Sequence, residues 1–455
     1  MTGLSTVGGD VPTLGECFNE GWEGEFMVSE QLDYRIVDAD NHFVEPPDLY
    51  ERFIDPSKQE MAIRFVKDPD SGRRLKLFSG KPSKFTITQV TFSKDELDKL
   101  LGTEEMSEKT RSILPGMFLN RLNPFKGLSQ EERTKLITEL AGQSESCGNR
   151  DLRLALMDEQ GIEAAIMYPG SAHDIEYELA DDVDAMYANF RAYNRWIHEE
   201  IGYAHEGRIF LPPYVPLADV DLAVKELEIL IETGAPMVQI KAGHAHGGRA
   251  NPGGGRSVAD PIFDPIWSRV DEAGLRLCSH LGGTDYQKYG ADWSEDPEVT
   301  FGDFDAFQWM MYWGDRPALE LTAGLILHNF FGRFPNIHVC LSEMGTVWLP
   351  YTLRKMDHAF MMGRKARYSE TGRLDRRPSE IFRQHFVVAP FPEENVRRVV
   401  DEVGIEPIVF GSDFPHGEGL AHPSEYVDAQ LAGFTAEDQK LIMRETMAKF
   451  LKIPA

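Results

Sequence analysis

Arg35-Ile-Val-Asp-Ala-Asp-Asn-His-Phe-Val-Glu-Pro-Pro47 is the stretch around which the chain is organised. It begins as a short apolar strand and ends in acids and a histidine. Side chains alternate between the two faces of a strand, so Asp40 and His42 lie on one face while Asn41 points the other way. Two such groups at a strand end can bind one metal ion. The alternative is a strand capped by a turn, with His42 paired to an acid in a polar network.

Further apolar segments of strand length follow, separated by segments with helical periodicity. The eight expected strands are 36–40, 164–169, 208–216, 237–241, 275–280, 337–343, 386–389 and 407–413. This alternation predicts an α/β fold and, because the strands number eight, a (β/α)8 barrel rather than an open doubly wound sheet. We expect an N-terminal arm at 1–34 and the barrel at 35–455. A long insertion after the first strand is expected at about 56–135, with a small hairpin in 74–88.

Polar residues fall at the ends of the expected strands. In a (β/α)8 barrel the catalytic groups lie at the C-terminal strand ends, and here later strands end in Lys241, His280, Glu343 and Asp413. Buried ionisable groups are costly unless they are paired or bind a metal. Taken singly, His280 is typical of a satisfied core histidine and Asp413 of a turn residue. Together with the pair on the first strand, they form a set suited to Zn²⁺, Mn²⁺ or Fe²⁺.

Composition excludes several kinds of partner. Lys and Arg number 47 against 74 Asp and Glu, a net charge of -27, which argues against nucleic acid or an anionic membrane as the main partner. The four cysteines have no close spacing and suit a reducing compartment. We see no signal peptide, which would begin with a basic region followed by an apolar core, and no apolar segment long enough to span a membrane. We therefore expect a cytoplasmic protein that acts on a small molecule.

Four motifs resemble the amidohydrolase superfamily, specifically the amidohydrolase-related branch that includes aminocarboxymuconate-semialdehyde decarboxylase and the γ-resorcylate decarboxylases. The motifs are Val-Asp-Ala-Asp-Asn-His-Phe-Val-Glu-Pro (37–46), Ser-His-Leu-Gly-Gly (279–283), Arg-Phe-Pro-Asn-Ile-His-Val-Cys-Leu-Ser-Glu-Met-Gly (333–345) and Gly-Ser-Asp-Phe-Pro-His (411–416). The resemblance extends from about residue 35 to 440 and implies a metal-bearing, TIM-like barrel of the metal-dependent hydrolase type.

Ligand roles follow from the resemblance, motif by motif. It implies that Asp40, His42, His280 and Asp413 are metal ligands. The commoner first motif of the superfamily is His-x-His, and the acid at Asp40 shifts the preference toward Mn²⁺ or Fe²⁺. Binuclear members carry a carbamylated lysine at the position of Lys241. We favour one ion over two, because two adjacent cations need several anionic ligands.

Further residues are candidates for the substrate site or for acid/base chemistry. Glu343 is interpreted as a ligand of a second metal or as a catalytic acid/base beside Asp413. Lys241, His416 and Arg249 are expected to contact the substrate. For His416 a structural hydrogen bond is the alternative, and for Arg249 the alternative is an exposed side chain in a glycine-rich loop.

The leading functional expectation is a metal-dependent hydrolase, in which a metal-activated water attacks a carboxylate- or amide-bearing substrate and Asp413 carries the proton. The first alternative is a non-oxidative decarboxylase of an aromatic or unsaturated carboxylic acid. The second is an iron-dependent oxygenase on a binuclear centre, and the third is a subunit that binds metal only structurally. Fold alone does not choose among them. The arm and the insertion predict a homodimer or larger oligomer, with association with a related subunit as a further option.

Overall fold

The structure, a computed structural model, describes most of the chain from residue 32 onward. The described residues are 32–67, 74–83, 146–170, 172–251, 254–284, 289, 293, 306–312, 315–365, 368–416, 419–420 and 422–453. Nearly all of them belong to one unit, Tyr34–Ala455. The expected arm lies almost wholly outside the described residues, and so does most of the expected insertion.

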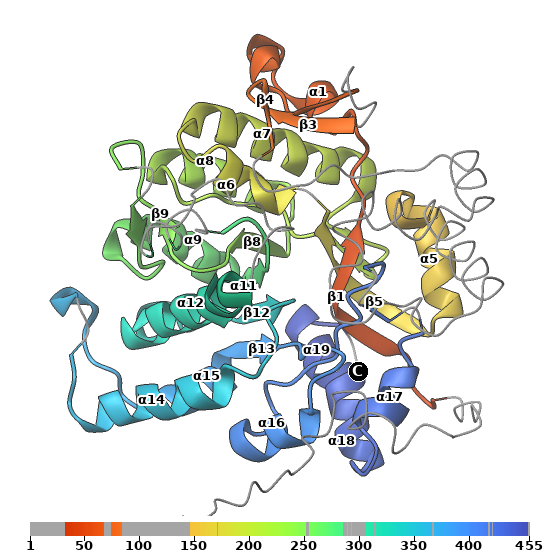
Figure 1. The fold of residues 1–455 in the computed structure, drawn as a ribbon, viewed down its shortest axis with the longest axis vertical. Helices are drawn as coiled ribbons and strands as arrows, with labels where there is room; N and C mark the ends of the chain where they lie inside the picture. The colour runs from red at the N-terminus through yellow and green to blue at the C-terminus, as the bar shows by residue number, and fades with distance from the viewer. Residues whose placement is uncertain are drawn as a thin grey trace, which may run out of the picture. The chain divides into compact units, whose positions relative to one another are not determined.

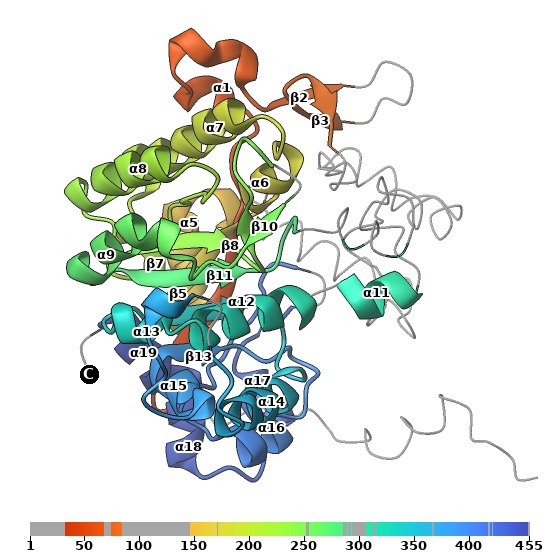
Figure 2. The same cartoon turned by 90° about the vertical axis from the view of Figure 1, so that its left-hand side faces the viewer.

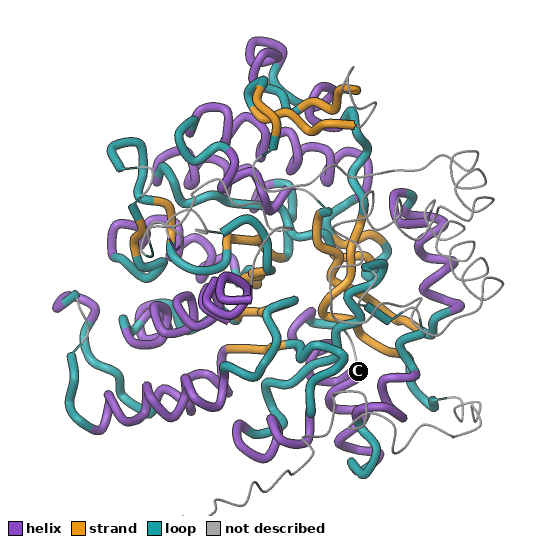
Figure 3. The backbone as a smooth tube through the Cα atoms, in the orientation of Figure 1, coloured by secondary structure: helices purple, strands orange, loops and turns teal. Residues whose placement is uncertain are grey.

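Two four-stranded sheets form the centre of this unit (Figures 1 and 3). The first contains, in spatial order, β1 (Ile36–Phe43), β5 (Ile162–Pro169), β7 (Ile209–Phe210) and β6 (Ala204–His205). The second contains β8 (Met237–Lys241), β11 (Arg276–His280), β12 (Val339–Ser342) and β13 (Phe386–Val388). Neighbouring strands are parallel, except that β6 is antiparallel to β7.

Single parallel bridges connect the two sheets. The bridged pairs are Tyr214–Gln239, Val388–Ile408 and Asn41–Phe414. Segment 408–414 thus lies between β13 and β1, which places β1 beside both the second strand and the last segment of the ring, as in a barrel. The predicted α/β fold is confirmed.

Two of the expected strands differ from the prediction. The segment 208–216 is a strand only at Ile209–Phe210, because Pro212, Pro213 and Pro216 have no N–H to donate to a ladder. The segment 407–413 is not a continuous strand at all. The amides of Ser412 and Asp413 both donate to the Asp40 carbonyl, at 3.1 and 2.7 Å, and Asp413 has a φ of 55°. A left-handed residue ends an extended segment.

Helices surround these strands (Figure 2). Their bounds are α1 (Leu49–Phe53), α5 (Arg150–Glu159), α6 (Ile175–Glu178), α7 (Val183–Trp196), α8 (Val220–Glu232), α9 (Asp264–Ala273), α11 (Ala306–Tyr312), α12 (Asp315–Leu327), α13 (Phe330–Arg333), α14 (Leu349–Met361), α15 (Pro378–His385), α16 (Val396–Val403), α17 (Glu425–Gln430), α18 (Ala436–Lys440) and α19 (Thr446–Leu451). Among the described helices, none is both long and apolar enough to cross a membrane. The cytoplasmic location stays a prediction.

Helix α8 illustrates how the sequence forms these crossovers. Its N-cap Asp219 accepts a hydrogen bond from the Leu222 amide, which satisfies a donor that the first turn leaves free. Ala223, Leu227 and Leu230 recur at helical spacing and are buried, and the helix packs against α9 (Figure 2). Burial stabilises each leucine by about 1.5–3 kcal/mol, so a Leu227→Ala change costs about 2–5 kcal/mol.

The C-terminal helix α19 packs at the start of the strands. Met447, Phe450 and Leu451 share one buried cluster with Val37 and Ala39 of β1. The guanidinium of Arg276, the first residue of β11, donates to the Phe450 carbonyl at 2.7 Å. Because this helix occupies the N-terminal side of the strands, polar chemistry is left to their C-terminal ends.

The described part of the insertion contains a short 3-10 helix (Pro56–Met61) and a small antiparallel sheet. The sheet consists of β2 (Arg64–Lys67), β3 (Arg74–Phe78) and β4 (Lys81–Pro82). The expected hairpin in 74–88 is present as β3 and β4, joined by Ser79 and Gly80, whose φ values of 46° and 77° suit a tight turn. Residues 84–88 lie outside the description, and the boundaries of arm and insertion stay predictions.

Candidate metal centre

An irregularity in β1 directs Asp40 and His42 toward the same point. The pairing of β1 with β5 shifts register between Asp38 and Asn41, and a Cβ on Gly411 would lie 2.7 Å from the Asp40 Cβ. Only glycine at position 411 therefore lets the last segment of the ring approach β1 so closely. Asp40 and His42 are both nearly inaccessible to solvent. The prediction that they share one face is confirmed.

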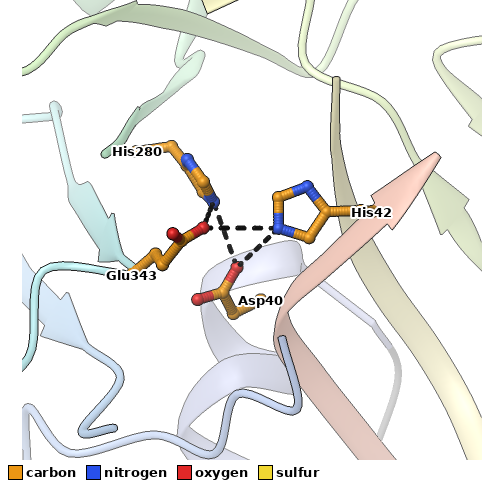
Figure 4. A group of neighbouring side chains, drawn as sticks. All are labelled: Asp40, His42, His280 and Glu343. Carbon is orange, nitrogen blue, oxygen red and sulfur yellow. Dashed lines mark ion pairs between the residues drawn. The ribbon is translucent and has the colours of Figure 1, made fainter. Parts of the chain in front are cut away.

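His280 and Glu343 complete a cluster of four side chains from three strand ends (Figure 4). His280 Nε2 lies 2.9 Å from Glu343 Oε2 and 3.4 Å from Asp40 Oδ1. His42 Nε2 lies 3.5 Å from Glu343 Oε2 and 3.9 Å from Asp40 Oδ1. All four ligand-type atoms lie within 4.8 Å of one another. Segments far apart in the sequence are thus brought to one point.

A second group of donor atoms shares two residues with the first. It consists of His42, Glu343, Asp413 and His416. Asp413 Oδ1 lies 3.1 Å from His42 Nε2 and 2.7 Å from His416 Nδ1. The rings of His42 and His416 are 3.9 Å apart. His416 is also the most open member of the combined site, with 37% of its side chain exposed.

Two of the carboxylates stand on left-handed backbone. Glu343 and Asp413 have φ values of 54° and 55°, a region that non-glycine residues rarely occupy. Such conformations persist where surrounding contacts enforce them, and they are common at functional sites. Here the conformation places both carboxylates beside His42.

The electrostatics of the cluster favour a cation. Burial lowers the pKa of His280, but the Glu343 and Asp40 carboxylates outweigh burial and raise it well above its usual value. Burial likewise raises the pKa of Glu343, yet the attraction of His280 leaves it well below its usual range. The pKa of Asp40 is raised, chiefly by burial. For Asp413, burial is outweighed by His416, so that its pKa is lowered. Three carboxylates in one buried site need positive charge to be stable.

The donor set fits a divalent metal ion. Asp40 Oδ1, His280 Nε2 and Glu343 Oε2 are buried and make no hydrogen bond with the described residues. His280 Nδ1 bonds to the Leu281 carbonyl, which fixes the ring so that Nε2 faces the cluster. Two carboxylates and two imidazoles suit Zn²⁺, Mn²⁺ or Fe²⁺. The side chain of Glu343 is 13% exposed, against 1% for His280, so the site is open on the side of Glu343 and His416.

The sequence profile of one family, described as amidohydrolase, matches residues 147–453. The chain belongs to the amidohydrolase family. The resemblance read from the motifs is thereby confirmed. Among curated proteins, no sequence match is found.

Solved structures extend the similarity over nearly the whole chain. An amidohydrolase from Mycobacterium avium subsp. paratuberculosis K-10 is 27% identical, with a TM-score of 0.72 over 92% of this chain and 98% of that one. The 2,6-dihydroxybenzoate decarboxylase from Rhizobium is 18% identical, with a TM-score of 0.55 over 92% and 99%. The 5-carboxyvanillate decarboxylase from Novosphingobium aromaticivorans DSM 12444, solved with bound manganese, has the same identity and TM-score over 93% and 98%. The last two likenesses show the fold alone.

The four ligands expected from the sequence, Asp40, His42, His280 and Asp413, differ in one member from the first donor group of the structure. Glu343, interpreted as a second-metal ligand or acid/base, belongs to the first group, whereas Asp413 belongs only to the second. Lys241 ends β8 and pairs in register with His280. Arg249 forms ion pairs with Asp184 and Asp219 at 2.9 and 3.4 Å. The roles of Lys241 and Arg249 stay predictions.

His173 lies beside the cluster and is not among the site residues expected from the sequence. Its ring stacks on His280 at 5.4 Å, and burial, reinforced by the positive charge of His280, holds the pKa of His173 well below its usual value. Glu45 accepts bonds from the amides of Gly170 and Ala172, and a Cβ on Gly282 would overlap the His173 ring. The only signal in the sequence is a histidine shortly after the second strand. Its placement depends on these long-range contacts.

Proposed function

We propose that the chain is a metal-dependent decarboxylase of a hydroxylated aromatic carboxylic acid, releasing CO₂ without an oxidant. The observation that carries the proposal is the Asp413–His416 pair, 2.7 Å apart, immediately beside a buried donor set suited to a divalent ion. Decarboxylation needs both parts, a cation for the substrate carboxylate and a proton donor for the carbon that loses it. The similarity in fold to two decarboxylases of aromatic acids supports the same reaction class.

Asp40, His42, His280 and Glu343 would hold the ion. When bound, a divalent ion supplies a Lewis acid that neutralises a substrate carboxylate and an adjacent oxygen. The buried walls of the site exclude water, and Tyr168, whose ring lies 4.4 Å from His280, gives the site an aromatic surface. The exposed side, formed by Glu343 and His416, is where the substrate enters.

Asp413 acts as the proton carrier in this proposal. Its pKa is lowered because His416 outweighs burial, so Asp413 is ionised at rest and must first accept a proton. His416 Nδ1, 2.7 Å away, delivers one when the imidazole is charged. Asp413 then protonates the ring carbon, the bond from that carbon to the carboxylate breaks, and CO₂ leaves. The bonding electrons restore the aromatic ring, and His416 recovers its proton from solvent.

The leading expectation from sequence, hydrolysis by a metal-activated water, fits the relatives in fold less well than its decarboxylase alternative. The sequence does not separate the two reactions, because both need the same cation and the same proton carrier. One observation supports oxygenation on a binuclear centre as a second candidate. The second donor group shares His42 and Glu343 with the first, as two adjacent metal ions would require.

The test is an assay of the Mn²⁺-loaded protein with 2-hydroxybenzoate, 2,6-dihydroxybenzoate and 5-carboxyvanillate. We expect CO₂ release that stops on chelation and returns with Mn²⁺. In D₂O the product should carry one deuterium at the vacated ring carbon. A panel of anilides and lactones is the matched comparison, and O₂ consumption is recorded in parallel. Hydrolysis of the panel without CO₂ release, or O₂-dependent turnover, would refute the decarboxylase assignment.

A further inference from the structure

A buried polar network lies directly behind the candidate ligands. Its members are Asp38, Asn41, Ser412 and Arg153, each with no more than 1% of its surface exposed. Asn41 stands between the two candidate ligands of β1, and Ser412 immediately precedes Asp413. Buried polar groups in proteins are normally held by complete hydrogen bonding. Its hydrogen bonds join β1 to the 412–414 segment, the two parts of the chain that carry Asp40, His42 and Asp413.

Asp38 connects β1 to the segment that carries Asp413. Its Oδ1 accepts the amides of Asp40 and Ser412, both at 3.0 Å. Its Oδ2 accepts the Ser412 hydroxyl at 2.6 Å and the Asn41 side-chain amide at 3.0 Å. Asp38 lies where β1 shifts register, so its carboxylate takes amides that a regular strand would give to the ladder. The shift is what directs Asp40 into the site.

Arg153 holds the other side of the same junction from helix α5. Its Nη2 donates to Asn41 Oδ1 and to the His42 carbonyl, at 2.6 and 2.5 Å. Its Cζ lies 4.7 Å from the centre of the Phe414 ring. One guanidinium thus contacts residues adjacent to Asp40, His42 and Asp413. Arginine suits this position because one nitrogen of its planar group donates to two acceptors while the face of the group lies over a ring.

We propose that Asp38, Arg153 and Ser412 are positioning residues that fix the β1 and 412–414 segments in the arrangement that binds the metal ion. The inference rests on the proposed metal centre but not on the reaction proposed for it. None of the three is among the candidate ligands, so they act through Asp40, His42 and Asp413. Groups that orient metal ligands typically set metal affinity by about 10–100-fold.

The test compares Mn²⁺ affinity in full-length variants, measured by calorimetry and by the electron paramagnetic resonance of bound Mn²⁺. Ser412→Ala removes one hydroxyl that bonds Asp38. Arg153→Lys keeps the charge but loses the planar group that lies over the Phe414 ring and donates to Asn41 and His42. We expect each to raise the Kd for Mn²⁺ by about 10–100-fold and to alter the spectrum of the bound ion. A role in folding alone would lower the melting temperature without changing either quantity in the folded protein.

Ser279→Ala is the matched control. Ser279 precedes His280 on β11, is fully buried, and its hydroxyl has no hydrogen-bond partner among the described residues. We expect its Mn²⁺ affinity to stay within about twofold of wild type, since it removes no bond that orients a ligand. Folded Ser412→Ala protein with the wild-type Kd and spectrum overturns the inference, whatever Arg153→Lys does. Wild-type protein that binds no divalent ion overturns the metal centre itself, which distinguishes the two failures.

Discussion

Metal binding is predicted to release a proton from His280. In the structure His280 Nε2 lies 2.9 Å from Glu343 Oε2 and 3.4 Å from Asp40 Oδ1. Burial lowers the pKa of the imidazole, but the two carboxylates raise it well above its usual value, so that Nε2 carries a proton at pH 7. A ligand nitrogen must be deprotonated before it binds a metal.

The size of the effect follows from proton competition. While His280 stays protonated in the metal-free protein, each pH unit changes the Kd for Mn²⁺ about tenfold, or ~1.4 kcal/mol. At pH values below the raised pKa of His280 the Kd should therefore fall as the pH rises, with about one proton released per ion. The pKa of Asp40 is also raised, chiefly by burial, so Asp40 can release a further proton at the acid end of the range. The pH dependence of the Kd is therefore measured near pH 7.

The assay is titration calorimetry in buffers of different ionisation enthalpy, which counts released protons directly. Glu343→Gln keeps the size of the side chain and removes the stronger carboxylate partner of His280. It is therefore predicted to weaken Mn²⁺ binding and to reduce both the proton count and the pH slope. A wild-type Kd that is constant from pH 6 to 8, with no proton released, would refute the reasoning about His280.

Three further predictions concern catalysis, assembly and stability. Asp413→Asn should retain bound Mn²⁺ and lose about 10²–10⁴-fold in turnover; wild-type turnover would exclude Asp413 as the proton carrier. The intact chain should be a dimer or larger assembly in light scattering, because none of the eight strands expected from the sequence falls in the arm or the insertion; a monomer at micromolar concentration rules this out. Burial, with Arg276 and His385 nearby, lowers the pKa of His338 to about 4, so the unfolded chain binds this proton first and stability falls as pH drops below 6.5. The free energy of unfolding falls by about 3 kcal/mol at most, and by about half that once the partial exposure of His338 is allowed for. In urea unfolding, the His338→Gln variant should lack this part of the pH dependence. A pH dependence equal to that of the wild type would reject the assignment to His338.

The sequence predicts those parts of the site that local rules determine. Alternation along β1 is enough to predict that Asp40 and His42 share one face, although it does not predict the register shift between Asp38 and Asn41. The barrel rule is enough to bring His280 and Glu343 to the same strand ends, although they are far apart in the chain. Both inferences need only the period of a strand and the position of a residue within it.

Other features depend on contacts that no local pattern contains. The last segment of the ring, expected as a strand at 407–413, is bent because Ser412 and Asp413 bond to the Asp40 carbonyl. In the sequence, Asp38 is one more polar residue of β1. In the structure, burial raises its pKa to about 6, although four hydrogen bonds act to lower it. Arg153 reads as a charge on an amphipathic helix, and only the packing of α5 reveals it as buried.

The most direct test of the metal centre is anomalous diffraction from Mn²⁺-loaded crystals at the manganese absorption edge. We predict one strong peak per chain among Asp40 Oδ1, His42 Nε2, His280 Nε2 and Glu343 Oε2, whose atoms already lie within 4.8 Å of one another. Asp413 and His416 should border this peak as the proton-carrying pair. No peak at these four atoms, or a peak bound by other residues alone, would contradict the account.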